Sequence, residues 1–223
     1  MNIRTCAKLG LAVASLLAVA ACSSSQPNAL ERAKSFPAML SNKKPAPPVV
    51  SPQQINALLA SSGKPSSVFV IEKTTAQFIM VEVERNGRMQ TFGSSSRQAI
   101  VVDRGKMVST RGFGGDLMSS EEGALMSKVR SRSAGTVNYA QRFLTSDNRT
   151  ITSVYECKLA TGGTVPVALG AVNSRGTVVT ADCSDPYVSF TNTYVVESGG
   201  YILSGRQWMG PTIGYMNIQP IRK

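Results

Sequence analysis

The chain has 223 residues, no histidine and a formal net charge of +11 at pH 7. Because histidine is missing, a Ser-His-Asp triad and most other histidine-based acid–base designs are excluded. The positive charge favours anionic neighbours such as acidic polysaccharide or lipid head groups, but general solubility explains it equally well.

The first 21 residues are predicted to be a lipoprotein signal peptide. Arg4 and Lys8 form a short positive region, and residues 9–19 are an apolar run too short to cross a bilayer as a permanent helix. The run leads into VAAC at residues 19–22, which fits the lipobox of bacterial lipoproteins. We expect cleavage before Cys22 and acylation of its thiol and amine, since two or more acyl chains hold a protein stably on a membrane.

An ordinary signal peptide cut after Ala21 is the alternative, and it would leave Cys22 a plain cysteine. The polar run at residues 23–27 argues against it, because such a run is typical of a flexible tether. Ser23 is also not the aspartate that retains lipoproteins in the inner membrane of enteric-type bacteria. We therefore expect a lipid-anchored protein on the periplasmic face of the outer membrane.

Residues 22–50 are expected to form the lipidated N-terminus and a tether, because they contain five prolines and few large apolar side chains. Residues 51–223 are long enough for one domain with a substantial core. Removal of residues 1–22 takes away Arg4 and Lys8 and no acidic residue, so the net charge of the remaining chain is +9.

A short helix is predicted to begin after Ser51. Ser51 suits the N-cap, Pro52 suits the first helical position, and Gln54 completes a capping box. Apolar residues at positions 55, 58 and 59 would share one face, and Gly63 would end the segment. We expect this amphipathic helix to cover a sheet.

Strands are predicted from Ser67 onwards, where β-branched and aromatic residues become frequent. Two tight turns are expected in this half, at Asn86-Gly87 and at Arg104-Gly105, and the first is the strongest hairpin signal in the chain. The expected strands are residues 68–72, 78–84, 89–92, 98–103 and 106–110.

A second short helix is predicted to run to about Val129, because residues 119–122 resemble another capping box. Later strands are expected between turns that include Gly162-Gly163 and residues 173–176. The intervals are too short for helical crossovers, so the pattern predicts a mostly β fold, an antiparallel meander that forms a barrel or a sandwich. The later strands are residues 137–144, 151–159, 164–172, 177–183, 187–197, 201–207 and 214–218.

Cys157 and Cys183 remain once the signal peptide is removed and Cys22 carries lipid. An oxidising periplasm favours a disulfide between them. The bridge would close a loop of about 27 residues, for which the chain-entropy model gives roughly 3.5 kcal/mol of stabilisation. No metal site is expected, because two thiolates without histidine do not complete a zinc shell. No cofactor motif is present either.

Asp103 and Asp116 flank a glycine-rich segment and could meet across it as a pair of catalytic carboxylates, as in glycosidases. The structural alternative places Asp103 in a turn with Arg104 and pairs Asp116 with an arginine. We favour the structural interpretation and expect no catalytic site.

Trp208 is the only tryptophan, and Tyr201, Arg206 and Tyr215 lie near it in the sequence. Such a group could stack on a sugar ring, whereas a single tryptophan in a β domain is most often packed in the core. We favour the packed interpretation and keep sugar stacking as the alternative.

Five stretches of the chain resemble one family. They read VDRGKMV, STRGFGGDL, FTNTYVV, SGRQWMGP and GYM, at residues 102–108, 109–117, 190–196, 204–211 and 214–216. Together with the lipobox, the β-rich body and the two late cysteines, they are similar to the group 4 capsule polysaccharide lipoproteins, the YjbF/GfcB family. The resemblance extends over roughly residues 50–223.

The resemblance implies a role in making or exporting capsule or another exopolysaccharide, and it implies no known catalytic residue. We therefore expect a non-catalytic accessory in capsule or exopolysaccharide assembly or export, with other envelope polysaccharide-export proteins as partners. No nucleic acid is expected, because an exported protein rarely meets it. An acidic-glycan-binding module is the alternative function, and a histidine-free polysaccharide hydrolase that uses Asp103 and Asp116 is a third. The candidate interaction surface comprises Arg104, Arg111, Asp116, Arg206, Trp208 and Tyr215.

Overall fold

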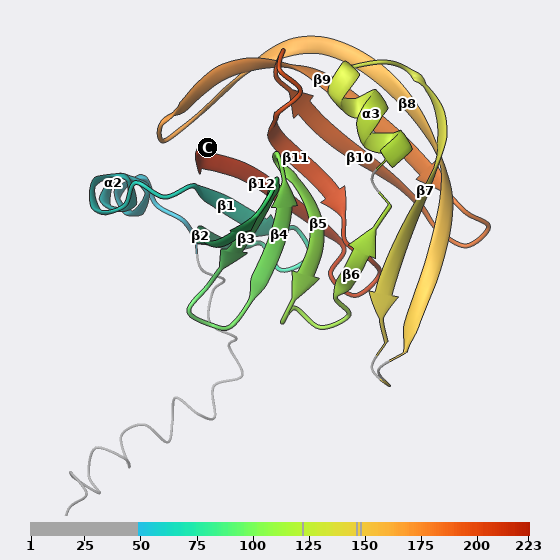
Figure 1. Cartoon of the computed structure of the whole chain (residues 1–223), viewed down its shortest axis with the longest axis horizontal. Coiled ribbons are helices and arrows are strands. Elements are labelled where there is room, and N and C mark those ends of the chain that lie inside the picture. Colours follow the sequence, from blue (N-terminus) through green and yellow to red (C-terminus); the bar gives the residue numbers. More distant parts are fainter. Residues whose placement is uncertain (1–48, 122, 146, 148) are drawn as a thin grey trace, which may run out of the picture. The chain divides into compact units, whose positions relative to one another are not determined.

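A computed structural model describes residues 49–223 apart from residues 122, 146 and 148. The predicted signal peptide, the lipidation site Cys22 and the tether up to residue 48 lie outside the described residues, so these features stay predictions. Within the described part, two short helices accompany one twelve-stranded sheet (Figure 1).

Helix α2 (Pro52–Ser61) begins as the sequence predicts. The hydroxyl of Ser51 accepts a hydrogen bond from the N–H of Gln54, and the side chain of Gln54 accepts one from the N–H of Ser51. The capping box is therefore confirmed. The helix ends at Ser61, slightly before the expected stop at Gly63.

The sheet is antiparallel throughout, which confirms the predicted fold class. Strands that are consecutive in sequence pair with each other, except that the last strand inserts beside the first, and β5 and β6 are left at the two edges. The strands are β1 (Ser66–Ile71), β2 (Ala76–Asn86), β3 (Met89–Gly93), β4 (Ala99–Asp103), β5 (Lys106–Arg111), β6 (Leu117–Ser120), β7 (Gly135–Leu144), β8 (Thr150–Leu169), β9 (Val172–Ser184), β10 (Ser189–Val196), β11 (Ile202–Trp208) and β12 (Tyr215–Arg222).

The two edge strands, β5 and β6, meet each other and nearly close the sheet into a barrel. Side chains join them: the N–H of Leu117 donates to the hydroxyl of Thr110 at 3.0 Å, and the hydroxyl of Ser120 donates to the carbonyl of Val108 at 3.2 Å. Of the two architectures left open by the sequence, the nearly closed barrel is the one that forms.

The two turns expected at Gly162-Gly163 and at residues 173–176 are wrong. β8 and β9 run through both positions as long strands and turn instead at Gly170-Ala171. Their pairing shifts register between Thr161 and Thr164, so the two glycines form a bulge within a strand. Glycine marks a bend here, whereas the sequence pattern predicted a turn.

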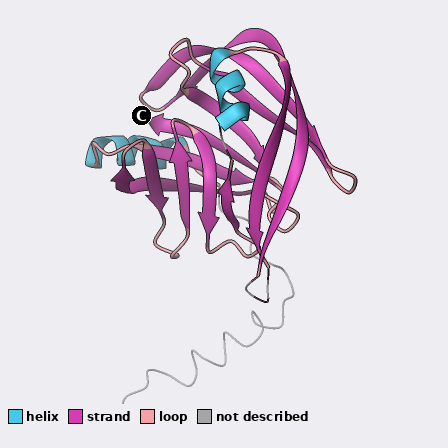
Figure 2. Cartoon of the chain, turned by 45° about the vertical axis from the view of Figure 1, so that its right-hand side comes forward, coloured by secondary structure: helices cyan, strands magenta, loops and turns pink. Residues whose placement is uncertain are grey.

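The far end of the long β8–β9 hairpin folds back over the outer surface of the sheet. Val167 and Val172 pack there against Leu203 of β11, and the N–H of Ala171 donates to the carbonyl of Ile221 in β12. Figure 2 shows the two long strands arching across this part of the body. The hairpin therefore extends the wall of the barrel into a flap that contacts its last strand.

The second helix, α3 (Gly123–Ser131), forms but begins later than predicted. The short strand β6 occupies the position at which a capping box was expected to open the helix, because Ser120 bonds across the seam to β5. Helix α3 buries Leu125, Met126 and Val129 against the sheet.

The buried apolar side chains of the described residues gather mainly into two clusters. One joins α3 to strands β7–β11, and the other lies mainly among β1–β6 and β12. Cys157 and Cys183 belong to the first cluster, lie opposite each other on β8 and β9, and form a disulfide with an S–S distance of 2.06 Å. The predicted pairing is confirmed.

Candidate functional site

Arg206 forms the centre of a polar network on β11, β12 and the end of β1. Its guanidinium donates to both carboxylate oxygens of Glu72, at 2.7 and 2.8 Å, and Asn217 donates to the same carboxylate at 3.0 Å. The guanidinium carbon lies 3.3 Å from the centroid of the Tyr215 ring. The structure thus brings together Arg206 and Tyr215 as the sequence predicted, but the arginine covers the face of the ring.

The ion pair shifts the pKa values of both partners. The hydrogen bond from Arg206 lowers the pKa of the Glu72 carboxyl, burial opposes this effect, and the hydrogen bond from Asn217 adds to it. The hydrogen bond to Glu72 in turn raises the pKa of Arg206. Because the two side chains are 35 % and 37 % exposed, solvent screens part of their attraction.

Trp208 is packed among other rings. Its indole stacks on Phe190 with centroids 5.8 Å apart and meets Tyr215 edge-on at 5.4 Å. Trp208 and Tyr215 both pack against the buried cluster beside α3. The structure therefore supports the core interpretation of Trp208, and sugar stacking on its face has no support from this arrangement.

A shallow cavity of about 420 Å³ opens beside Tyr215. Asp182, Ser189 and Thr191 contribute polar groups to its lining, and the hydroxyl of Thr191 donates to the Asp182 carboxylate at 2.6 Å. The turn between β9 and β10 adjoins this cavity and presents Tyr187, which is 92 % exposed. Neither Tyr187 nor Asp182 was a candidate site residue from the sequence, because exposed aromatic and turn residues have no distinctive spacing.

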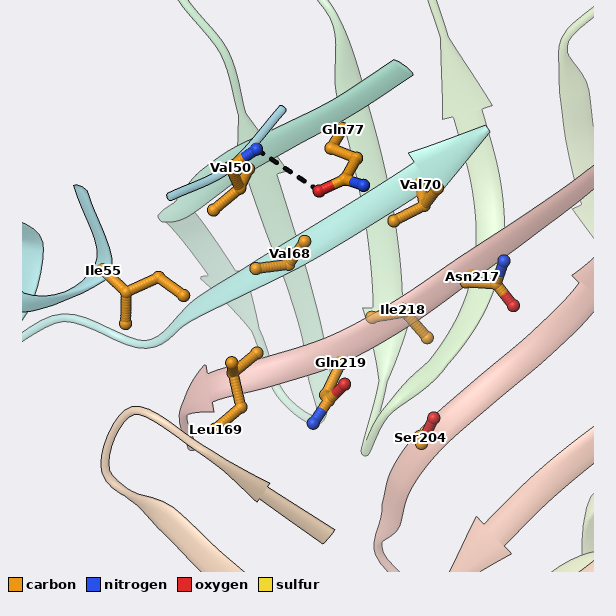
Figure 3. Close-up of a pocket in the computed structure, with 10 residues that line it drawn as sticks. All are labelled: Val50, Ile55, Val68, Val70, Gln77, Leu169, Ser204, Asn217, Ile218 and Gln219. Carbon is orange, nitrogen blue, oxygen red and sulfur yellow. Dashed lines mark hydrogen bonds between the residues drawn. The ribbon is translucent and has the colours of Figure 1, made fainter. Parts of the chain in front are cut away.

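An uncharged groove of about 390 Å³ lies between α2 and the tip of the β8–β9 hairpin (Figure 3). Val68 and Val70 line it from β1, Gln219 lines it from β12, and Ile55 and Leu169 lie toward one end of it in this view. Because none of its lining residues is charged, the groove suits a mixed apolar and hydrogen-bonding segment better than an ion.

Asp103 and Asp116 do not form a catalytic pair. Asp103 ends β4 beside the turn, whereas Asp116 lies beyond the opposite end of β5. The length of β5 separates them by about 17 Å at roughly 3.3 Å per residue. The hydrolase interpretation therefore loses its only candidate residues.

Asp116 instead holds the glycine-rich segment in place. Its carboxylate accepts hydrogen bonds from the hydroxyl of Thr110 and from the N–H groups of Gly112 and Phe113, at 2.9 to 3.1 Å. The structural interpretation of Asp116 is right, but its partners are a hydroxyl and backbone groups, where an arginine was expected. The neighbouring Arg111 is exposed and donates to the carbonyl of Thr110.

Asp103 lies buried beside three arginines. Arg88 and Arg130 approach its Oδ2 atom at 3.2 and 3.5 Å, and Arg104 approaches Oδ1 at 3.8 Å. Arg104 was expected in a turn with Asp103. Arg88 and Arg130 were missed, because they come from the β2–β3 turn and from α3 and only the folded chain brings them together.

In the described part of the chain, no three acidic or cysteine side chains are grouped closely enough to hold a metal ion. None of the described helices is long and apolar enough to span a membrane. The six residues of the candidate interaction surface lie at three places: Arg206, Trp208 and Tyr215 at one, Arg104 in the β4–β5 turn at the second, and Arg111 with Asp116 at the opposite end of β5 at the third.

Comparison with known families matches residues 33–221 to a family model described as "Group 4 capsule polysaccharide lipoprotein gfcB, YjbF". Among solved structures, the chain is similar to the crystal structure of the hypothetical lipoprotein YmcC from Escherichia coli (K12), with a TM-score of 0.63 and 14 % identity. That similarity covers 89 % of this chain and 98 % of the other, and at this identity it shows a shared fold. No curated protein matches the chain.

Proposed function

Since this chain belongs to the family of group 4 capsule polysaccharide lipoproteins, we propose that it is a non-catalytic accessory in the assembly or export of capsule or exopolysaccharide. The family match over residues 33–221 is the observation that carries the proposal. It agrees with the resemblance read from the sequence motifs.

Two features support a non-catalytic role. The chain has no histidine, so the commonest general acid–base side chain is missing. Asp103 and Asp116 were the candidate catalytic carboxylates from the sequence. They lie at opposite ends of β5, where Asp103 pairs with arginines and Asp116 accepts a hydrogen bond from Thr110. The protein would then act by binding partners, which we propose to be other envelope proteins of polysaccharide export.

We also propose that lipid on Cys22 anchors the protein on the periplasmic face of the outer membrane. The apolar run at residues 9–19 and the lipobox at residues 19–22 support this location. Attachment through two or more acyl chains would hold the protein at the membrane. The residues between Cys22 and Val49 would act as the tether that the sequence predicts.

The test is deletion of the gene followed by measurement of surface polysaccharide. We expect a loss of surface capsule or exopolysaccharide in the deletion strain and recovery when the gene is restored. Unchanged surface polymer would rule out the assembly role. Purified protein should also leave the chain length of the polymer unchanged on incubation, and shortening would replace the accessory role with a hydrolytic one.

The second candidate function is an acidic-glycan-binding module. It is favoured by the surplus of arginines over carboxylates around Asp103 and by the net charge of +9 on residues 23–223. Such binding would be compatible with the accessory role, because an accessory protein of export could bind the polysaccharide directly.

A further inference from the structure

A recess of about 210 Å³ lies between α3 and two hairpin turns of the sheet. Helix α3 contributes one face to it, with residues at positions 123, 126, 127 and 130, spaced as neighbours on a helix surface. Arg88 of the β2–β3 turn and Asp103 and Arg104 at the β4–β5 turn complete the lining. The recess is therefore framed by three separate elements.

The charged groups in the recess are unequal in number. Three arginines, Arg88, Arg104 and Arg130, approach the single carboxylate of Asp103 at 3.2 to 3.8 Å. Among the described lining residues, cations thus outnumber anions by three to one. Such an excess in a partly enclosed site attracts anionic ligands.

Arg130 is engaged by the protein itself. Its side chain is 11 % exposed and donates to the carbonyls of Asp103 and Gly200, each at 2.8 Å. Arg130 lines the recess, and its two hydrogen bonds connect the β4–β5 turn to the turn before β11. Its role in the recess is therefore positional.

Arg88 and Arg104 present their guanidinium groups to the solvent. Their side chains are 61 % and 47 % exposed, and each meets Asp103 through Nε. Within the described residues, the terminal nitrogens of both arginines donate no hydrogen bond. Two guanidinium groups with unused donors at one recess form a geometry suited to a carboxylate, which accepts such donors in pairs.

Asp103 contributes the complementary group. Its Oδ1 atom is buried and accepts no hydrogen bond within the described part of the chain. A ligand hydroxyl that donates to this oxygen would satisfy it as the Arg104 side chain moves toward the anion. The recess thus offers donors for an anion and an acceptor for a hydroxyl side by side.

The backbone under Arg104 is fixed. Arg104 and Gly105 form the β4–β5 turn with φ values of +43° and +87°, and the N–H of Ile202 donates to the carbonyl of Arg104 at 3.1 Å. A Cβ on Gly105 would overlap the carbonyl of Ile202, so the turn packs closely against β11. Asparagine or glycine is the favoured residue at the first position of such a turn, yet an arginine occupies it here.

We propose that this recess binds carboxylate-bearing sugar residues of an acidic polysaccharide, with Arg88 and Arg104 on the carboxylate and Asp103 on a neighbouring hydroxyl. A sugar acid carries both groups on one ring, which matches the pairing of donors and acceptor. An anionic membrane is matched less well, because it is recognised by basic side chains spread across a surface. This proposal specifies the ligand of the proposed function. It rests on the proposed function for the identification of the polymer as capsule polysaccharide.

The test is electrophoresis of the full lipidated chain, in detergent micelles, through gels that contain polygalacturonate or neutral dextran. We expect polygalacturonate alone to retard the protein, and the retardation to disappear between about 50 and 300 mM salt. Arg88→Gln with Arg104→Gln should weaken binding about tenfold or more, since two charge-assisted contacts are lost. Arg104→Lys should give an intermediate loss, because the charge stays and the bidentate geometry goes.

A matched control removes two other arginine charges, Arg97→Gln with Arg175→Gln, both exposed and outside the lining of the recess: Arg97 lies before β4, at the opposite end of that strand from Arg104, and Arg175 lies on β9. This pair should bind like the unmodified protein, and thermal unfolding should confirm that all variants fold. Equal losses in the two pairs would overturn the proposal in favour of general charge attraction. Absence of retardation by polygalacturonate, or its removal by vesicles of anionic lipid, would also overturn it. Neither result depends on a capsule phenotype. The proposed accessory role is therefore tested separately, by surface polysaccharide in the deletion strain.

Discussion

Glu72 and Arg206 show how one residue pair joins distant parts of the chain. They are 134 residues apart, and the pair links the end of β1 to β11 across β12. Since Arg206 lowers the pKa of Glu72 in the folded protein, the pair favours folding above the ordinary carboxyl pKa of about 4.3. That contribution is lost as the pH falls through the lower pKa of the folded state.

Glu72→Gln should therefore lower the free energy of unfolding at pH 7 by about 1 kcal/mol, a value reduced for partial exposure. The difference from the unmodified protein should vanish at an acidic pH below the lowered pKa of the folded state, where the carboxyl is protonated in both the folded and the unfolded protein. Urea denaturation at the two pH values measures it, with Glu84→Gln, an exposed glutamate of the neighbouring strand, as the control. An equal loss in the control, or a difference that persists in acid, would contradict this assignment.

At the scale of elements, two turn glycines that look alike in the sequence have different surroundings in the fold. Gly87 and Gly105 both lie in two-residue hairpin turns and both have positive φ, at +57° and +87°. A Cβ on Gly87 would contact nothing within 4 Å, whereas one on Gly105 would overlap the backbone of Ile202. The first glycine serves its own turn, and the second also allows two elements to approach.

Gly87→Ala should cost about 1 kcal/mol of stability, the strain of alanine in a left-handed conformation. Gly105→Ala should cost at least about 3 kcal/mol, because overlap with β11 is added to that strain. Chemical denaturation of the two variants measures the difference. Similar losses would mean that the β4–β5 turn does not pack against β11 in solution.

The disulfide acts on the longest hairpin of the sheet. Cys157 and Cys183 lie opposite each other on β8 and β9 and are separated by 26 residues. Reduction should lower the free energy of unfolding by about 3 kcal/mol, through the greater freedom of the unfolded chain. The double variant Cys157→Ala, Cys183→Ala should show no response to reductant. An unmodified protein whose stability is insensitive to reduction would contradict this role.

Local chemistry predicted most elements but not their lengths. The capping box at Ser51 places its partners three residues apart, so it could be read directly from the sequence. Gly162 and Gly163 do not tell a turn from a bulge within a strand, because both structures favour glycine. The extra length of β8 and β9 comes from packing on β11 and β12, which a local pattern does not contain.

At the scale of the whole molecule, closure depends on the pairing of the first and last strands. β12 lies between β1 and β11, and this insertion is what leaves β5 and β6 to face each other. The barrel class could be predicted from strand spacing, but this order could not, because hydrophobic alternation does not specify partners. The arginine recess was missed for the same reason, since it joins Arg88, Asp103 and Arg130 from three elements.

We propose above all that this chain is an anchored, non-catalytic lipoprotein that supports capsule or exopolysaccharide assembly. The most direct test measures surface and released polysaccharide in a deletion strain that carries either the unmodified gene or Cys22→Ser, at equal protein levels. We predict that only the form able to carry lipid restores surface polymer. Full restoration by Cys22→Ser would contradict the anchored role, and normal polymer in the deletion strain itself would contradict the claim as a whole.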